Sequence, residues 1–265
     1  MKSKWLNLTV AALVVFLFVS VSAAKADGGD VYWHVDPNVK TCSMVIDPSL
    51  TQAQCHRFIK QGGAILTFKS LASAKTLGKM KFNIAIDDAY TPVDQHDKAW
   101  INTFAHPDEN CPLGDAISFP ALRASMCVSD NMDVGGYWTV APGANYGLAA
   151  GEFKYAFSQE TEKRPAAAVR ASIATLTGVP DFNLNIYSVD LMASKKISIL
   201  TPYVGLKESL LDGNETTAKV ALDRERFSLT QGYAGVTYSL WMLNLAAEYN
   251  LSSLNTFTFA IGSNF

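Results

Sequence analysis

The feature that most constrains this chain is a hydrophobic period of two that begins near residue 79 and recurs to its last residue. In 80–87, 243–250 and 256–265, apolar residues alternate with small or polar ones. Successive side chains of a β-strand point to opposite faces of a sheet, so each segment predicts a strand with one apolar and one polar face. Such segments are roughly ten residues long here and follow one another after short turns, which favours an antiparallel meander.

Ten segments of this kind are predicted in 79–265, and we expect them to close into an up-and-down transmembrane β-barrel. They cover 79–91, 117–130, 132–141, 145–158, 165–178, 181–194, 197–211, 226–240, 242–252 and 254–265. Twelve strands are the alternative, with Gly63–Leu71 and part of Val31–Val35 as the added pair. A soluble β-sandwich has the same period, so alternation alone does not place the sheet in a membrane.

Aromatic residues and the last strand favour the membrane. Aromatic side chains gather near the ends of predicted strands, as in interfacial girdles. They are Tyr137, Trp138, Tyr155, Phe157, Tyr203, Tyr238, Trp241, Tyr249 and Phe265. The alternating last strand carries Phe257, Phe259 and Phe265. This ending resembles the signal that the barrel-assembly machinery reads in bacterial outer-membrane proteins, so we expect that machinery and outer-membrane lipid as partners.

The beginning of the chain predicts secretion. Residues 1–26 have a basic start, an apolar run and small residues around Ala26, as a signal peptide does. After it, no apolar stretch reaches the roughly 20 residues of a membrane helix. Removing Lys2, Lys4 and Lys25 takes the net charge from −2 to −5, and an acidic chain gives no reason to expect nucleic acid. We therefore expect the outer membrane of a Gram-negative cell.

The segment 27–78 differs from the barrel in kind, and we expect it to be periplasmic or lumenal. A short helix is predicted over 49–61, with Ser49 as its N-cap and Gly62-Gly63 as its stop. It could plug the lumen, lie across the periplasmic mouth or act as a tether. Since the C-terminus of such barrels lies in the periplasm, the connections 91–117 and 211–226 are expected outside, and this segment is expected to begin inside.

The four cysteines would meet an oxidising compartment, where pairing is expected. Cys42 and Cys55 flank the proline turn of the N-terminal segment, near its predicted helix, and are the best pair on proximity. Cys111 belongs to an outer connection, whereas Cys127 lies near the periplasmic end of a strand. These two could bond only if the connection folded down the lumen.

Charged residues on the polar faces of the strands are the candidate functional residues. With each apolar face toward lipid, the predicted lumen-lining residues are Lys81, Asp87, Arg123, Glu152, Lys154, Arg170, Lys207 and Glu248. A narrow passive channel for small solutes is the leading expectation, and its basic excess would favour small anions. The alternative is a structural or surface-binding barrel whose lumen is closed by salt bridges, because buried charges need partners.

An enzyme is not expected. None of the four histidines lies on a predicted strand of the ten-strand barrel. The 91–117 connection contains acids together with His96 and His106, but no spacing matches a known catalytic or metal motif. We therefore expect no cofactor and no metal, and regard this connection as a solvated outer loop.

Three segments carry a resemblance to known proteins. Gly63–Gly78, Asp133–Trp138 and Leu200–Gly205 resemble segments of a family of uncharacterised proteobacterial outer-membrane β-barrel proteins. The resemblance runs over most of the mature chain and implies the barrel fold and the outer-membrane location. It implies no substrate and no catalytic residue.

Overall fold

The computed structural model describes residues 44–104, 115–140 and 146–265. The predicted signal peptide, the Val31–Val35 segment, Cys42, Cys111 and His106 lie outside these described residues. No helix within them is long and apolar enough to cross a membrane.

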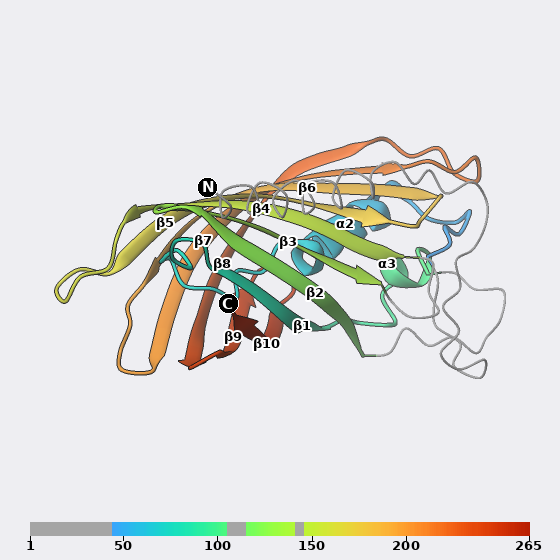
Figure 1. Cartoon of the computed structure of the whole chain (residues 1–265). Helices are drawn as coiled ribbons and strands as arrows, with labels where there is room; N and C mark the ends of the chain where they lie inside the picture. The colour runs from blue at the N-terminus through green and yellow to red at the C-terminus, as the bar shows by residue number, and fades with distance from the viewer. Residues whose placement is uncertain (1–43, 105–114, 141–145) are drawn as a thin grey trace, which may run out of the picture. The chain divides into compact units, whose positions relative to one another are not determined.

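Ten antiparallel strands form a closed barrel, as the alternation predicted (Figure 1). They are β1 Phe82–Pro92, β2 Ala116–Ser129, β3 Met132–Val140, β4 Gly147–Ser158, β5 Ala166–Thr177, β6 Phe182–Ser194, β7 Leu200–Glu215, β8 Glu225–Leu240, β9 Leu243–Leu251 and β10 Thr256–Asn264. Each strand pairs with the next, and β1 pairs with β10 from Asn83↔Asn264 to Tyr90↔Phe257. Every backbone edge of the sheet is thereby paired, which a barrel requires in lipid.

The twelve-strand alternative is wrong, because Gly63–Leu71 is not a strand. Its first residues complete α2, Gln52–Leu66, and the rest are extended chain without a partner strand. The helix begins after Thr51 rather than Ser49, since Thr51 and Gln54 form a capping box. The predicted stop at Gly62-Gly63 is also wrong: both glycines are helical and buried. A second helix, α3, covers Lys98–Ile101.

The two ends of the barrel differ, and we name them by their connections. At the turn end β2–β3, β4–β5, β6–β7 and β8–β9 are joined, with only Asp130 and Asn131 between β2 and β3. At the loop end the strands are joined in the other consecutive pairs, and the described residues there include 93–104 and 216–224. Phe265 lies at the turn end, where its ring stacks on Phe82 at 4.8 Å between centroids. Recognition of the last strand by assembly machinery stays a prediction.

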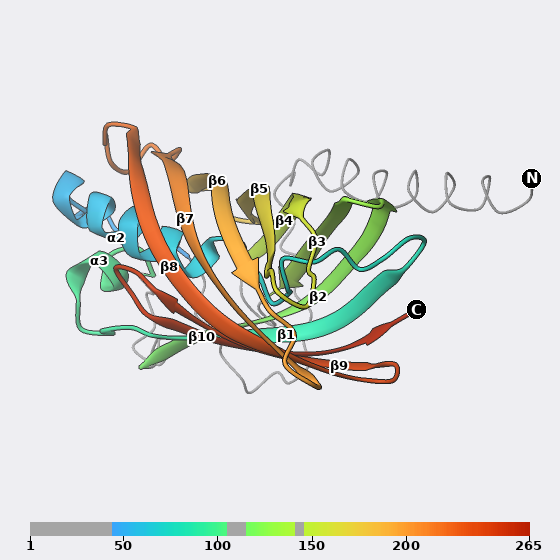
Figure 2. The same cartoon turned by 90° about the vertical axis from the view of Figure 1, so that its left-hand side faces the viewer.

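The chain before β1 runs through the barrel from the loop end to the turn end. Val45 N–H donates to the Thr103 carbonyl at 3.0 Å, and the Gln52 side chain bonds to Asp223 and Glu225 at the loop end. Farther along the chain, the Thr76 hydroxyl donates to the Asp130 carbonyl at the turn end, at 3.1 Å. Figures 1 and 2 show α2 at the loop end among the strands.

The described part of this segment therefore begins at the loop end, beside the 216–224 connection, and not, as was expected, at the end where Phe265 lies. Which end faces the periplasm stays a prediction. Strand parity orients only the strands. A segment that precedes β1 can reach the first residue of β1 either directly at the turn end or through the lumen from the loop end. A 15-residue helix is about 22 Å long, so α2 and the extended chain after it are enough to cross the barrel.

The inside and the outside of the barrel exchange polarity along its length, as β6 illustrates. Its inward side chains run from the loop end to the turn end as Phe182, Leu184, Ile186, Ser188, Asp190, Met192 and Ser194. Its outward side chains run in the same direction as Asn183, Asn185, Tyr187, Val189 and Leu191. Toward the loop end the barrel thus has an apolar core and a polar exterior, and toward the turn end the reverse.

The loop-end core is built around α2. Phe58, Ile59, Ile65 and Leu66 of the helix are buried there against inward side chains of the strands. These strand side chains are Ile117, Phe119, Ala121, Tyr137, Leu148, Ala150, Ala174, Phe182, Leu184, Ile186, Leu211 and Leu229. Burial of this apolar surface is the main term that holds α2 inside the barrel.

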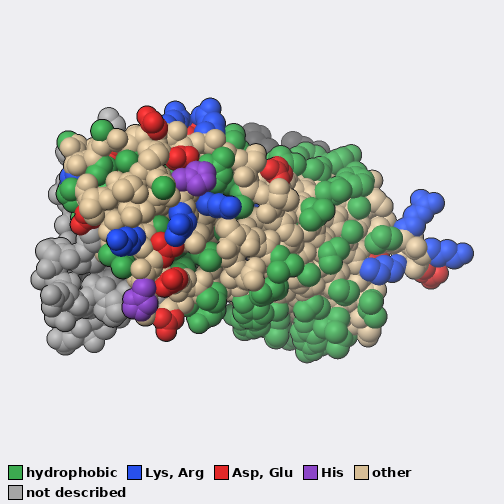
Figure 3. Space-filling model, turned by 180° about the vertical axis from the view of Figure 1, so that it is seen from behind, with side chains coloured by type: hydrophobic (Ala, Val, Ile, Leu, Met, Phe, Trp, Pro, Cys, Tyr) green, Lys and Arg blue, Asp and Glu red, His purple; other side chains and the backbone are tan. Residues whose placement is uncertain are grey.

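Exposed apolar side chains cover the outer face of the turn-end half, and we call them the apolar band. They are Phe82, Ile84, Ile86, Leu122, Val128, Trp138, Phe153, Tyr155, Phe157, Ile173, Val189, Leu191, Leu200, Val204, Leu206, Leu240, Leu243, Tyr249, Leu251, Phe257, Phe259 and Ile261. Figure 3 shows hydrophobic side chains gathered over this half, with charged ones toward the two ends. Outward carboxylates limit the band on the loop side: Asp88 accepts from Ser118 at 2.7 Å, and Glu208 from Thr230 at 2.6 Å.

Candidate functional site: the filled lumen

Seven of the eight residues predicted to line the lumen lie inside it. Six are buried, and Glu152 is half-buried: Asp87, Arg123, Lys154, Arg170, Lys207, Glu248 and Glu152. Lys81 is the exception, because it precedes the first residue of β1 and its side chain is exposed. The alternation of apolar and polar residues in β1 extends to Lys81, one residue before the strand begins, and this is why Lys81 was predicted to face the lumen.

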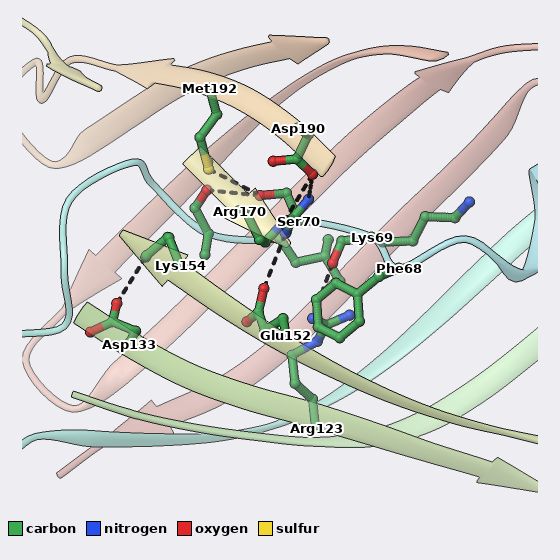
Figure 4. Close-up of polar contacts among 12 residues, drawn as sticks. Phe68, Lys69, Ser70, Arg123, Asp133, Glu152, Lys154, Arg170, Asp190 and Met192 are labelled. Carbon is green, nitrogen blue, oxygen red and sulfur yellow. Dashed lines mark hydrogen bonds and ion pairs between the residues drawn. The ribbon is translucent and has the colours of Figure 1, made fainter. Parts of the chain in front are cut away.

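Arg170 on β5 is the centre of the turn-end lumen, with a side chain only 1% exposed. Its Nε donates to Asp190 Oδ2 on β6 at 2.9 Å, a second guanidinium nitrogen bonds to the same oxygen, and its Nη1 donates to Glu152 Oε2 on β4 at 3.3 Å (Figure 4). The guanidinium lies 5.2 Å from the Phe68 ring centroid. One buried cation therefore has two acidic partners and an aromatic face.

Arg123 on β2 makes similar contacts and also approaches the Phe68 ring. Its Nε donates to Asp87 Oδ2 on β1 at 2.8 Å, and its guanidinium carbon lies 4.7 Å from the Phe68 centroid. Its Nη1 donates to the backbone carbonyl of Lys69 at 3.0 Å. The Phe68 ring is thus close to the guanidinium groups of two arginines from different strands.

The extended chain after α2 passes between these charges, and we call residues 67–77 the lumen segment. Strand side chains bind its backbone along its whole length. The Lys207 ammonium donates to the Phe68 carbonyl. Glu248 accepts from the N–H groups of Ser70 and Leu71 at 3.1 and 2.8 Å.

The contacts continue toward the turn end. Lys154 donates to the carbonyls of Ser73 and Lys75 at 3.1 and 3.0 Å and forms an ion pair with Asp133 at 2.9 Å. Asp133 in turn accepts from the Leu77 N–H at 3.2 Å. The charges that line the lumen therefore have partners in one another and in the lumen segment, and are not presented to solvent.

Sequence reasoning missed two lumen acids, Asp133 and Asp190. Both occupy inward positions whose outward neighbours are apolar, so the period-two pattern of β3 and β6 contained the signal that would have found them. Without Lys81 and with these two, the strands contribute more lumenal acids than bases. The bases are Arg123, Lys154, Arg170 and Lys207, and the acids are Asp87, Asp133, Glu152, Asp190 and Glu248. The expected basic excess, and the anion preference that followed from it, are therefore corrected.

The lumen segment adds one more basic side chain to this set. Lys69 is buried, and its ammonium donates to the Ala64 carbonyl at 2.8 Å and to Thr67 Oγ1 at 3.3 Å. Counting it, five basic and five acidic side chains meet in the lumen. Charge matching in a low-dielectric interior is what makes such a set tolerable.

The loop end is closed by α2 and α3. Trp100 of α3 packs edge-on against Phe58 of α2 at 5.2 Å, and its indole N–H donates to Gln61 at 2.5 Å. A small pocket beside these rings is lined by apolar side chains. On the opposite flank of α2, His56 contacts Glu225 of β8 at 2.9 Å.

The rim offers no assembled metal site in the described ranges. No group of three or more His, Cys, Asp or Glu residues there is placed to hold an ion. His96 is exposed, with its backbone N–H bonded to Asp94, and Asp97 caps α3 and binds Arg57 at 3.0 Å. The absence of an enzymatic activity stays a prediction.

Cys55 and Cys127 are buried free thiols among the described residues. The expected Cys42–Cys55 disulfide is therefore not seen, and Cys42 itself lies outside the described residues. Burial in α2, together with the nearby carboxylates of Glu225 and Glu215, raises the pKa of the Cys55 thiol to about 11. Cys127 donates to the Ser129 carbonyl at 2.9 Å, at the turn end of β2.

Comparisons with known proteins find the barrel architecture. No protein-family model and no curated protein matches the chain. It is similar to the N-terminal β-barrel domain of Pseudomonas aeruginosa OprF, with 14% identity over 71% of this chain and 99% of that one and a TM-score of 0.35. The outer membrane protein OprG of the same species has 12% identity, 73% and 99% coverage and a TM-score of 0.30. The translocator domain of Neisseria meningitidis autotransporter NalP has 12% identity, 81% and 94% coverage and a TM-score of 0.39. At these identities the likeness concerns the fold alone.

Proposed function

We propose that this chain is an outer-membrane β-barrel that is closed by its own lumen segment and acts through the structure it presents at its loop end. The apolar band supports insertion into a bilayer, because large apolar side chains around a closed barrel are stable outside water only in lipid or against protein. The polar exterior beyond the band supports a loop-end half that stands in water. This is a structural or surface-binding barrel, the alternative that the lumenal charges raised.

The observation that carries the proposal is that the lumenal charges bind the backbone of residues 67–77. Arg123, Lys207 and Lys154 donate to its carbonyls, while Glu248 accepts from its N–H groups. An open pore would leave those side chains to water and to permeating solutes. Displacing the segment would also expose the buried apolar face of α2, to which it is covalently joined.

A passive channel would need the segment to leave the lumen or to leave room beside it. Breaking one partner of a buried ion pair typically costs about 3–5 kcal/mol. Several such contacts and the loop-end core would have to be given up together. We therefore expect the resting barrel to be closed to small solutes.

Planar bilayer recordings test this. The folded protein is expected to add no steady conductance, and liposomes that contain it are expected not to swell in small sugars. The matched pair of variants is Glu248→Ala, which removes an acceptor of the lumen segment, and Asp181→Ala, which removes the half-buried partner of Lys219 at the loop end. Conductance that appears only with Glu248→Ala supports closure by the segment. Steady unitary conductance from the unmodified protein contradicts the proposal and restores the channel.

A further inference from the structure

Two neighbouring turns at the turn end expose a cluster of apolar side chains, which we call the apolar turn patch; the β6–β7 turn also carries Lys195 and the exposed Lys196 and Ser198. The members of the patch are Ile197, Ile199 and Leu200 of the β6–β7 turn and Leu240, Trp241, Met242 and Leu243 of the β8–β9 turn. The turns adjoin each other, since the Ser239 N–H donates to the Ile199 carbonyl. Trp241 is 93% exposed, the largest value among the exposed large hydrophobic side chains of the described residues.

Two residues of these turns have backbone conformations that are unfavourable for their side chains. Trp241 has a φ of 56° and Ser198 a φ of 59°, a left-handed conformation that glycine and asparagine adopt far more readily than tryptophan. A tight turn in water would ordinarily carry Asn, Asp or Gly at such positions. Because Trp241 has an unfavourable backbone conformation and an exposed side chain, we expect that side chain to contact something outside the chain.

The other two turns at the same end serve as an internal comparison. The β2–β3 turn consists of Asp130 and Asn131, and the β4–β5 turn, 159–165, is polar and charged. Lys195, just before the apolar turn, binds carbonyls of the β4–β5 turn, including that of Glu162 at 2.9 Å. The apolar composition is thus local to the side of the barrel formed by β6 to β9.

The patch is continuous with the apolar band. On β7 the outward side chains Leu200, Val204 and Leu206 are exposed and apolar, and the run ends toward the loop side at Glu208. On β9 the band continues directly from Leu243. Along β7 and β9 no polar outward side chain separates the turns from the strands that lipid would cover, whereas on the β6 side Lys195 and Lys196 precede Ile197.

The height of the band shows why the turns are needed. From Leu200 to Leu206 the strand rises ~20 Å, which at a tilt of about 40° is ~16 Å along the membrane normal. Bacterial barrels present an apolar belt of about 25 Å. Extending the run to Ile197 adds up to ~8 Å and brings it to that height without placing Glu208 in the bilayer.

We infer that the apolar turn patch is immersed in the lipid leaflet on the turn side, so that β6–β9 enter the membrane deeper than β2–β5 do. The partner of the patch is thus a lipid surface, and continuity with the band distinguishes it from a separate protein-docking site. The inference rests on the proposed membrane insertion. It adds a depth of the β6–β9 turns in the membrane, and hence a tilt of the barrel, that the barrel fold alone does not require.

Tryptophan quenching in vesicles tests the depth. The mature protein, W241F and W138F are refolded into phosphatidylcholine vesicles with lipids brominated near the headgroup or midway along the acyl chains. The difference in emission between the mature protein and each variant reports the tryptophan that was replaced. Trp138, an outward residue of the apolar band on β3, serves as the reference for membrane insertion. Trp241 is expected to lose most of its emission to the brominated lipids and to resist acrylamide in the aqueous phase.

Each other outcome is informative. If Trp138 is quenched by brominated lipid while Trp241 is quenched only by acrylamide, the protein is in the membrane but the turn is in water, and the inference fails. If Trp241 resists both quenchers, the patch is covered by protein, and a partner or a second copy replaces lipid. If neither tryptophan responds to brominated lipid, the proposed membrane insertion itself fails.

A pair of charge variants gives an independent readout. W241D adds an acidic group to the patch, and N131D adds the same group to the polar turn at the same end. W241D is expected to lower the yield of refolding into vesicles several-fold, with N131D unchanged and both folding normally in detergent micelles. Equal yields for the two variants in vesicles would overturn the inference.

Discussion

Gly62 and Gly63 stand side by side in α2 but face different surroundings. A Cβ on Gly62 would meet Leu184 and Phe58 at 3.9 Å, an ordinary contact, whereas one on Gly63 would lie 1.8 Å from Leu211 Cδ2. Leu211 is fully buried, so its side chain has little room to move. The glycine at 63 is therefore required by the approach of the helix to β7, and the one at 62 is not.

We expect Gly62→Ala and Gly63→Ala to change the free energy of unfolding in opposite directions. Alanine gains up to about 1 kcal/mol of helix propensity at either position. Overpacking against Leu211 should cost Gly63→Ala about 1–3 kcal/mol, so that it lowers the free energy of unfolding while Gly62→Ala leaves it unchanged or raised. Denaturant titration of the refolded protein, followed by its gel mobility, measures both. Equal stability of the two variants would show that α2 does not approach β7 as described.

Cys55 gives a second prediction at this scale. Its thiol is buried and its pKa is raised to about 11, so almost no thiolate is available to react at neutral pH. The folded protein should therefore leave Cys55 unmodified by a maleimide, and the denatured protein should react at Cys55 without any reductant. Peptide mass mapping locates the label. A requirement for reductant would instead show the Cys42–Cys55 disulfide.

At the scale of elements, the direction in which α2 and the lumen segment cross the barrel can be tested by labelling. Ser49, just before α2, and Ala218, in the β7–β8 connection, are exposed at the loop end, and Lys163 is exposed at the turn end. In intact cells, a membrane-impermeant maleimide should label Ser49→Cys and Ala218→Cys alike. Lys163→Cys should react only after the outer membrane is opened. If Ser49→Cys instead reacts only under the conditions in which Lys163→Cys reacts, the segment enters the barrel from the turn end.

The strands could be predicted from sequence because their signal is local and repeated. Each outward or inward position is set by a period of two, so all ten strands and most of their lumenal charges followed from it. The helix end could not be predicted, because Gly62 and Gly63 have the composition of a stop and their actual role depends on Leu211, far along the chain. The path of residues 67–77 was equally hidden, since strand side chains bind its backbone and backbone groups are the same in every sequence.

At the scale of the whole molecule, the exchange of polarity along the strands separates a half with an apolar exterior from a half with a polar exterior. A sequence prediction that assigns one apolar face to each strand misses this exchange, because the same period continues while inside and outside trade composition. Near the loop end the barrel is organised like a soluble protein, with α2 in its core. Near the turn end it is organised like a membrane protein with a polar, charge-matched interior.

Two arginine substitutions on one strand test this division. Leu191 and Asn183 both point outward on β6, Leu191 within the apolar band and Asn183 beyond it. Leu191→Arg places a charge in lipid, which costs about 2–4 kcal/mol near the bilayer midplane and less toward its edges. Asn183→Arg stays in water and should change stability by no more than about 0.5 kcal/mol. Denaturant titrations in vesicles should therefore shift strongly for Leu191→Arg alone; comparable shifts for both would mean that the apolar band does not mark the membrane.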